Sequence, residues 1–313
     1  GVSDIEAIIR ADELCNLLGL DTISTASVIQ WAMECFDRGV LKPEDAGGLE
    51  LRFGNAEAML TAIERIVQRK DLGALLAEGV KVASEELGHD SYKWAIQAKG
   101  LEQSRVETRS ANAYALAFAV NPRGPDHLHA QPIAEFGIKA GAKELIRKIT
   151  GDEKYATPYI TEKRAEIVRW HEDVYAATDS LGFCTFTSTS LYDVTPERMA
   201  SMFSAFTGHQ IGERELLTAG RRIVTLERCF NVREGLDRSY DTLPWRLMNE
   251  RLPDRDDAEA INSPERLGRM LDEYYGLHGW SVSTGIPKRS TLDALGLSVI
   301  AEDLERCGIR LED

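Results

Sequence analysis

The sequence lacks a long apolar run, an excess of basic charge and clustered cysteines. A membrane-spanning helix needs roughly 20 consecutive apolar residues, and no run here approaches that length. No charged, apolar and small-residue leader opens the chain. The formal net charge of −14 argues against a nucleic-acid-binding role, because phosphate binding needs a basic face. We therefore expect no membrane and no nucleic-acid partner.

The five cysteines are few and widely scattered: Cys15, Cys35, Cys184, Cys229 and Cys307. No pair has Cys-x-x-Cys spacing, and the distribution does not resemble a disulfide framework. A reducing cytoplasm is therefore the expected location. The chain cannot by itself supply four closely spaced thiolates to a metal cluster, but it can supply one.

What the sequence does contain is helical periodicity. Hydrophobic residues make up 43% and charged residues 28%, which is ordinary for a globular protein, and 313 residues are enough for two domains. We predict an all-α, multihelical fold of two packed helical domains with little or no sheet, residues 1–97 and 98–313. Predicted helices include residues 5–18, a second helix capped by Thr25 or Ser27, and residues 133–149, 161–181, 196–207 and 213–230.

Two of these helices end in the same pattern. Gly19-Leu20-Asp21-Thr22-Ile23-Ser24 follows the first, and Gly182-Phe183-Cys184-Thr185-Phe186-Thr187 follows helix 161–181. Both patterns give glycine, apolar, ligand-capable residue, threonine, apolar, hydroxyl. A glycine just past a helix end is typical of a left-handed cap. Two such turns could face one bound object from two sides, although helices that end at glycine are common in any helical protein.

The residues around these turns favour a role beyond folding. A carboxylate in the last turn of a helix opposes the helix dipole, so Asp179 is locally unfavourable and a specific function is favoured. On residue type alone, Cys184 could be a ligand, and the alternative is that it packs as a small buried hydrophobic residue. Polar chemistry is densest in the loop at residues 121–129, where Arg123, Asp126, His127 and His129 lie within seven residues; a surface histidine is the alternative there.

These motifs resemble the tungsten-containing aldehyde:ferredoxin oxidoreductases, in which (Asp or Asn)-x-x-Gly-(Leu or Phe)-(Cys or Asp) occurs twice with threonine following. Ordered blocks at residues 11–25, 230–235, 241–244, 271–275 and 279–280 extend the resemblance over nearly the whole chain. It covers the family's second and third domains, at the C-terminal end. It implies that an N-terminal pterin-binding domain and a Cys-x-x-Cys-x-x-x-Cys segment precede Gly1. We therefore expect a fragment that is inactive alone and holds neither a tungstopterin nor a [4Fe-4S] cluster.

The resemblance also implies a role for each motif residue. Cys184 would be the fourth ligand of a [4Fe-4S] cluster, the other three coming from the N-terminal segment. A tungstopterin cofactor (bis-pterin tungsten or molybdenum) would be bound by Asn16, Gly19, Leu20 and Asp21 on one side and by Asp179, Gly182 and Phe183 on the other. His127 would lie near the metal as a proton donor or as a contact to the substrate oxygen, with His129 as the competing candidate. Asn16 departs from the family's usual aspartate, which puts its contact in doubt; Phe183 in place of leucine is a milder change.

The activity that the resemblance implies is oxidation of a small-molecule aldehyde to a carboxylic acid with oxygen from water. Two electrons would pass through the pterin and the cluster to ferredoxin or another electron-transfer protein. Whether the metal is tungsten or molybdenum stays open, and so does whether the protein forms a homo-oligomer. One alternative is a family relative that acts on another substrate, such as an aromatic acyl-CoA. Another is a cofactor-free helical scaffold or partner-binding fragment.

Overall fold

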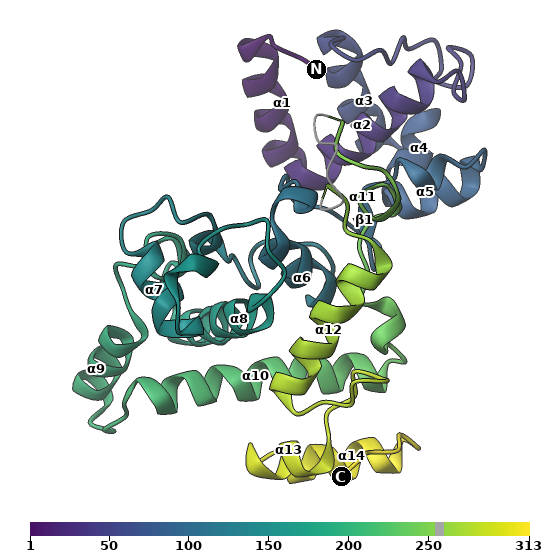
Figure 1. The fold of residues 1–313 in the computed structure, drawn as a ribbon. Helices are drawn as coiled ribbons and strands as arrows, with labels where there is room; N and C mark the ends of the chain where they lie inside the picture. The colour runs from purple at the N-terminus through teal and green to yellow at the C-terminus, as the bar shows by residue number, and fades with distance from the viewer. Residues whose placement is uncertain (254–259) are drawn as a thin grey trace. The chain divides into compact units, whose positions relative to one another are not determined.

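The computed structural model describes residues 1–253 and 260–313, and the regular secondary structure of this part of the chain is almost entirely helical (Figure 1). It contains fourteen α-helices and one two-stranded antiparallel ribbon. The predicted multihelical all-α fold is confirmed. The described helices include none long and apolar enough to cross a membrane. The chain forms two compact units, which we describe separately, and the predicted domain boundary at residue 97 stays a prediction.

The first unit comprises residues 1–105, 123–125 and 243–250. Its core is formed by apolar side chains of the N-terminal helices, with Trp31 at its centre, 2% exposed. The indole Nε1 of Trp31 donates a hydrogen bond to the carbonyl oxygen of Ser91 at 3.0 Å, which satisfies its polar atom inside the core. The elements are α1 (Ile5–Leu18), α2 (Thr22–Asp37), α3 (Ala56–Gln68), α4 (Leu72–Leu76), α5 (Gly79–Leu87), η1 (Ser91–Lys93), β1 (Gln97–Ala98), β2 (Leu101–Glu102) and α11 (Trp245–Asn249). In the ribbon, Gln97 pairs with Glu102 and Ala98 with Leu101.

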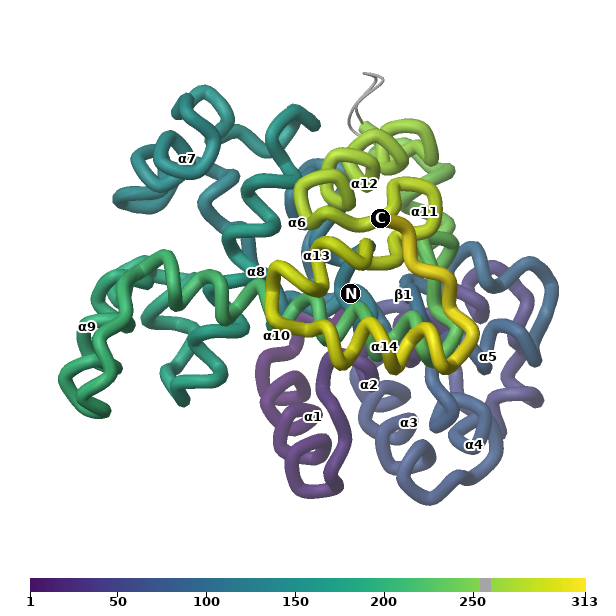
Figure 2. The backbone as a smooth tube through the Cα atoms, turned by 90° about the horizontal axis from the view of Figure 1, so that it is seen from below, coloured from purple at the N-terminus to yellow at the C-terminus, as the bar shows by residue number. Residues whose placement is uncertain are grey.

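The second unit comprises residues 106–122, 126–242 and 251–313. Its α-helices are α6 (Asn112–Val120), α7 (Ala142–Thr150), α8 (Arg164–Leu181), α9 (Pro196–Thr207), α10 (Glu213–Arg233), α12 (Pro264–His278), α13 (Arg289–Ala294) and α14 (Ser298–Arg306). Short turns of helix connect them: η2 (Thr108–Ser110), η3 (Ile133–Phe136), η4 (Glu153–Tyr155), the π-helical η5 (Phe186–Ser190) and η6 (Arg238–Tyr240). The two C-terminal helices α13 and α14 lie together (Figure 2).

Helix α8 organises the second unit, because α6, α7, α10 and α12 all pack against it. Every residue of α6 is buried, so this alanine-rich helix is part of the core. The contact between α8 and α10 is close enough to require a glycine. A Cβ atom at Gly220 on α10 would lie 2.1 Å from the carbonyl oxygen of Asp173 on α8, far inside van der Waals contact.

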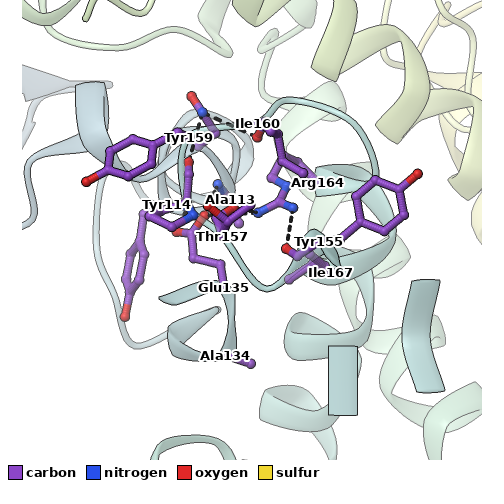
Figure 3. A network of polar contacts seen from close by, with 12 residues as sticks. Ala113, Tyr114, Ala134, Glu135, Tyr155, Thr157, Tyr159, Ile160, Arg164 and Ile167 are labelled. Atoms are coloured by element: carbon purple, nitrogen blue, oxygen red, sulfur yellow. Dashed lines mark hydrogen bonds and ion pairs between the residues drawn. The ribbon is translucent and has the colours of Figure 1, made fainter. Parts of the chain in front are cut away.

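A buried ion pair holds the start of α6 (Figure 3). Glu135, from η3, accepts hydrogen bonds from the backbone N–H groups of Ala113 at 2.9 Å and Tyr114 at 3.2 Å. These are orphan donors of the first helical turn, and a carboxylate there also complements the helix dipole. Arg164 lies 3.4 Å from Glu135, and both side chains are fully buried. The guanidinium also donates to the carbonyl oxygens of Tyr155 and Thr157, so one pair ties three segments together.

Two predicted helix boundaries are wrong. Helix α2 begins at Thr22 rather than at a cap formed by Thr25 or Ser27, because the carboxylate of Asp21 accepts a hydrogen bond from the backbone N–H of Ser24 and caps the helix earlier. The predicted helix at residues 133–149 is interrupted. Gly137 and Gly141 adopt left-handed φ angles of 66° and 76°, which end η3 and delay α7 to Ala142.

Candidate cofactor-binding site

The two helix ends that share a sequence pattern also share a backbone geometry. Gly19 and Gly182 have left-handed φ angles of 72° and 71°. The backbone N–H of Leu20 donates to the carbonyl oxygen of Cys15 at 2.9 Å, and that of Phe183 donates to Thr178 at 3.1 Å. Each bond spans five residues across the glycine, which is the Schellman cap. The same sequence order therefore builds the same turn twice, once in each unit.

In the first unit, the turn after α1 leaves two polar acceptors exposed. The side-chain amide nitrogen of Asn16 donates to the backbone oxygen and to the carboxylate of Asp12, at 3.0 and 3.1 Å. This orientation leaves the carbonyl oxygen Oδ1 of Asn16 as an available acceptor. Asp21 uses Oδ1 to cap α2 at 2.7 Å from the Ser24 nitrogen; the structure shows no partner for Oδ2 among the described residues. Asp21 thus has a structural role besides the predicted one.

In the second unit, the turn after α8 presents an exposed thiol. Cys184 is exposed, as are Asp179 and Gly182, whereas Cys15, Cys35 and Cys229 are buried. The carbonyl oxygen of Cys184 accepts hydrogen bonds from the backbone N–H and the hydroxyl of Thr187, at 3.0 and 2.7 Å. The sulfur therefore projects from a turn whose backbone is fixed on both sides.

These residues fit a cofactor that is completed by groups from elsewhere. Each glycine has open space on its side-chain face, since no other part of the described chain comes within 4 Å of a Cβ built at Gly19 or Gly182. Large apolar side chains are exposed beside the turns, Leu17 at 78% and Phe186 at 68%. In residues 1–253 and 260–313, no group of three or more His, Cys, Asp or Glu side chains is arranged to hold a metal ion. The donor set here is one thiolate, which matches a single cluster ligand.

The first unit also contains a cavity of the size of a small-molecule site beside α1. Its volume is about 630 Å³, within the range of ligand pockets, roughly 300–1,000 Å³. Apolar side chains such as Ile8, Ile29 and Met33 line it, together with Thr25 and Arg105. Burial lowers the pKa of Arg105, because desolvation disfavours its charged form.

The two candidate histidines are in different environments. His127 is partly exposed, and its Nδ1 lies 3.8 Å from the Asp126 carboxylate. The side chain of His129 is only 13% exposed, and its Nε2 lies 2.9 Å from a carboxylate oxygen of Glu227 on α10. His129, in a loop, is therefore held in place by a residue of α10. His127 is the more exposed of the two histidines.

Blocks of the sequence that carried the resemblance meet in a buried cluster of the second unit. Asp241 accepts hydrogen bonds from Arg228, at 2.8 Å, and from the hydroxyl of Tyr275. The guanidinium of Arg228 lies over the rings of Tyr275 and Trp280 at 5.6 and 5.5 Å, a cation–π arrangement. The pKa of Arg228 is raised above its ordinary value: burial opposes the charge, and Asp241 together with Tyr275 and Tyr274 more than offsets it.

A second buried group lies next to it. The hydroxyl of Tyr274 donates to both carboxylate oxygens of Glu172, at 3.0 and 2.9 Å, and Nε2 of His278 lies 2.8 Å from that carboxylate. Burial raises the pKa of a carboxyl, but the contacts with His278 and Tyr274 and the electrostatic influence of His129 hold the pKa of Glu172 below its ordinary value. The sequence analysis did not find this cluster, because Glu172 lies about 100 residues before Tyr274 and shares no local pattern with it.

The helical units, the paired turns and the exposed thiol are compatible with part of an oxidoreductase, and comparison with known proteins supports this class. The family model described as aldehyde ferredoxin oxidoreductase, domains 2 & 3, matches residues 1–297. The chain belongs to this family, as the sequence resemblance predicted. The two turns lie in different units, so the prediction that they face one cofactor stays a prediction.

Several relatives are similar over nearly the whole chain. The tungsten-containing aldehyde ferredoxin oxidoreductase of Thermococcus kodakarensis is 32% identical over 95% of this chain and 46% of that protein. The WOR-like subunit of the aliphatic sulfonate oxidoreductase of Pyrococcus furiosus is 27% identical over 99% of this chain and 46% of that subunit. Among solved structures, the active-site complex BamBC of benzoyl-coenzyme A reductase with 1,5-dienoyl-CoA is similar, with a TM-score of 0.75 and 25% identity over 98% of this chain and 48% of that one. The chain thus spans about half the length of these relatives.

Proposed function

We propose that this chain is the C-terminal part of a tungsten or molybdenum bis-pterin oxidoreductase that oxidises aldehydes to carboxylic acids. Electrons would leave through a [4Fe-4S] cluster to ferredoxin. The observation that carries the proposal is the exposed thiol of Cys184 in the Schellman turn of α8, matched by the same turn after α1. The tungsten-containing relatives support the choice of cofactor.

Each motif residue has a task that its position allows. Asn16, Asp21 and Asp179 would accept hydrogen bonds from pterin N–H groups, and Gly19, Leu20, Gly182 and Phe183 would bring the backbone close to the rings. The Cys184 thiolate would ligate the cluster, with three more thiolates from the N-terminal domain. When bound, the metal–pterin group supplies the two-electron oxidation and the cluster carries the electrons onward. His127 would hold the substrate oxygen or donate a proton to it.

The test uses the full-length protein. We expect aldehyde-dependent reduction of ferredoxin or of a viologen dye, with carboxylic acid as the product. His127→Gln should lower kcat by about 10² to 10⁴-fold, the usual contribution of a general acid or base. Exposed His209, which lies in a different segment, provides the control His209→Gln. Fully metallated protein that oxidises no aldehyde would contradict the substrate assignment.

A second candidate is reduction of an aromatic acyl-CoA at the same kind of cofactor. It is favoured by the structural similarity to the benzoyl-coenzyme A reductase complex over 98% of the chain. Incubation with benzoyl-CoA and a strong one-electron donor distinguishes the two, since only this candidate predicts a dienoyl-CoA product. A cofactor-free helical scaffold is the third possibility, and it predicts a folded full-length protein without tungsten, molybdenum or iron.

We further propose a cytoplasmic location, which suits free thiols and an oxygen-sensitive cluster. Assembly with the N-terminal domain and with an electron-transfer protein follows from the same proposal, and size-exclusion chromatography of the full-length protein tests for a homo-oligomer.

A further inference from the structure

A small cavity lies between α10 and the buried aromatic cluster of the second unit. His129, Glu227, Arg228, Asn231, Tyr274 and Trp280 are among its lining residues. The space available to the centre of a water molecule is about 10 Å³, which is about what one water needs. Its walls are polar as well as aromatic, so it differs from the dry apolar cavities that stay empty in proteins.

Three polar atoms of the lining residues are buried without a hydrogen-bond partner in the described chain. They are Nδ1 of His129, Nη2 of Arg228 and Nε1 of Trp280. Trp280 is 3% exposed and Arg228 5% exposed, so bulk solvent does not reach them. A buried polar group without a partner is destabilising, and folded proteins contain few such groups.

The chemistry of these three atoms matches a single water molecule. The indole Nε1–H and the guanidinium Nη2–H are donors only. Nε2 of His129 faces a carboxylate oxygen of Glu227 at 2.9 Å, and a carboxylate accepts, so Nε2 carries the hydrogen and Nδ1 is the acceptor in the neutral ring. A water has two lone pairs and two hydrogens. It can accept from Trp280 and Arg228 and donate to His129.

We propose that one structural water occupies this cavity and that His129, fixed by this water and by Glu227, is the positioning residue of the segment that carries His127. The proposal rests on the proposed function for the role of His127, but not for the water itself. His129 ends a short segment with hydrogen bonds of its own: Leu128 donates its backbone N–H to the Asp126 carboxylate at 2.8 Å, and Asn121 donates to the Asp126 carbonyl oxygen at 2.9 Å. The contact between His129 and Glu227 connects this segment to α10.

The arrangement gives His129 a role different from that of His127. A histidine whose two nitrogens are both engaged in the protein interior does not reach a substrate, but it fixes the backbone two residues away. A displacement of about 1 Å in a catalytic group can cost about 10²-fold in rate. The two histidines therefore act together, and only one of them touches the reacting molecule.

The first experiment is a crystal structure of the full-length protein at a resolution that shows ordered water. The proposal expects one water within hydrogen-bond distance of Nδ1 of His129, Nη2 of Arg228 and Nε1 of Trp280, and its loss or displacement in Trp280→Phe, which removes only one donor from the ring system. His129→Phe should shift or disorder residues 126–129 while α10 stays in place. An empty cavity in the wild type, or an unmoved segment in His129→Phe, would overturn the proposal. This readout does not depend on activity or on the cofactor.

The second experiment is a double-mutant cycle on kcat. His129→Phe should lower kcat by about 10- to 100-fold with little change in KM, because it misplaces a group used in the transition state. His129→Gln, which keeps a donor toward Glu227, should restore most of the loss. In a His127→Gln background His129→Phe should cost nothing further, because residues that act as a unit are not additive. Equal costs in both backgrounds would show that His129 acts independently of His127 and would refute the positioning role, while metal content reports separately on the proposed function.

Discussion

Removal of the Glu135 carboxylate should destabilise the second unit more than any surface substitution. The change is Glu135→Ala, measured at pH 8, because burial raises the pKa of this carboxyl to about 7 and the carboxylate is ionised above that value. The N–H groups of Ala113 and Tyr114 lose their side-chain acceptor, and the guanidinium of Arg164 loses its charged partner. All are inside the core, with Arg164 0% exposed.

The loss of stability in Glu135→Ala depends on the charge of Arg164, which stays buried without its partner. Breaking a buried ion pair by removing one partner costs about 3–5 kcal/mol, because an uncompensated charge stays in the interior. For a unit of this size, 1 kcal/mol corresponds to about 2–4 °C in Tm. We therefore expect Glu135→Ala to lower the Tm of the second unit by about 6–20 °C.

Thermal unfolding followed by circular dichroism provides the measurement. Glu64→Ala is the matched control, because Glu64 is an exposed glutamate on α3, and such changes usually stay within about 0.5 kcal/mol. The double variant Glu135→Leu with Arg164→Met should lose less than the sum of the single losses, since no charge is left unpaired. A Glu135→Ala variant with a Tm within about 2 °C of the wild type would show that Glu135 does not stabilise the second unit in this way.

Three further outcomes follow from single positions. Burial lowers the pKa of His171 to about 4 from 6.5, so the unfolded chain binds this proton more readily than the folded chain. Acidification from pH 7.5 to 4 should therefore lower the free energy of unfolding of the wild type by about 3 kcal/mol more than that of His171→Phe. The same pH dependence of the unfolding free energy in both proteins, measured by urea denaturation, would contradict this. Gly220→Ala should destabilise the protein by about 1–3 kcal/mol, because the new Cβ clashes with α8. The control Gly276→Ala, with open space around its new Cβ, should be neutral or stabilising by up to about 1 kcal/mol. Similar Tm values for both variants would argue against the close contact between α8 and α10. Gly182→Ala should cost about 1–2 kcal/mol, because only glycine adopts its left-handed φ without strain, and an unchanged Tm would show that the turn relaxes.

Local signals in the sequence were sufficient for the helix ends that matter most. Helix α1 and the end of α8 are where the pattern predicted them, because a glycine past an amphipathic run determines the turn within a few residues. The start of α2 was missed although its signal is also local: Asp21 was interpreted as a ligand and not as the cap that it also is. A residue with two roles is assigned only one of them by a motif.

Long-range contacts were out of reach of the sequence. His129 meets Glu227 across 98 residues, and Tyr274 meets Glu172 across 102. Their pairing depends on how α8, α10 and α12 pack, which periodicity does not specify. The choice between His127 and His129 therefore stayed open in the sequence, and the difference in their contacts becomes visible only in the folded unit.

The central claim is that Cys184 ligates an iron–sulfur cluster, and its most direct test is metal analysis of the full-length protein. We expect tungsten or molybdenum together with about four irons per chain, and loss of iron in Cys184→Ser. Cys307→Ser is the control, because Cys307 is also an exposed free cysteine, and it should keep its iron. A soluble, folded full-length protein without these metals, or a Cys184→Ser variant with undiminished iron, would show that Cys184 is not a cluster ligand.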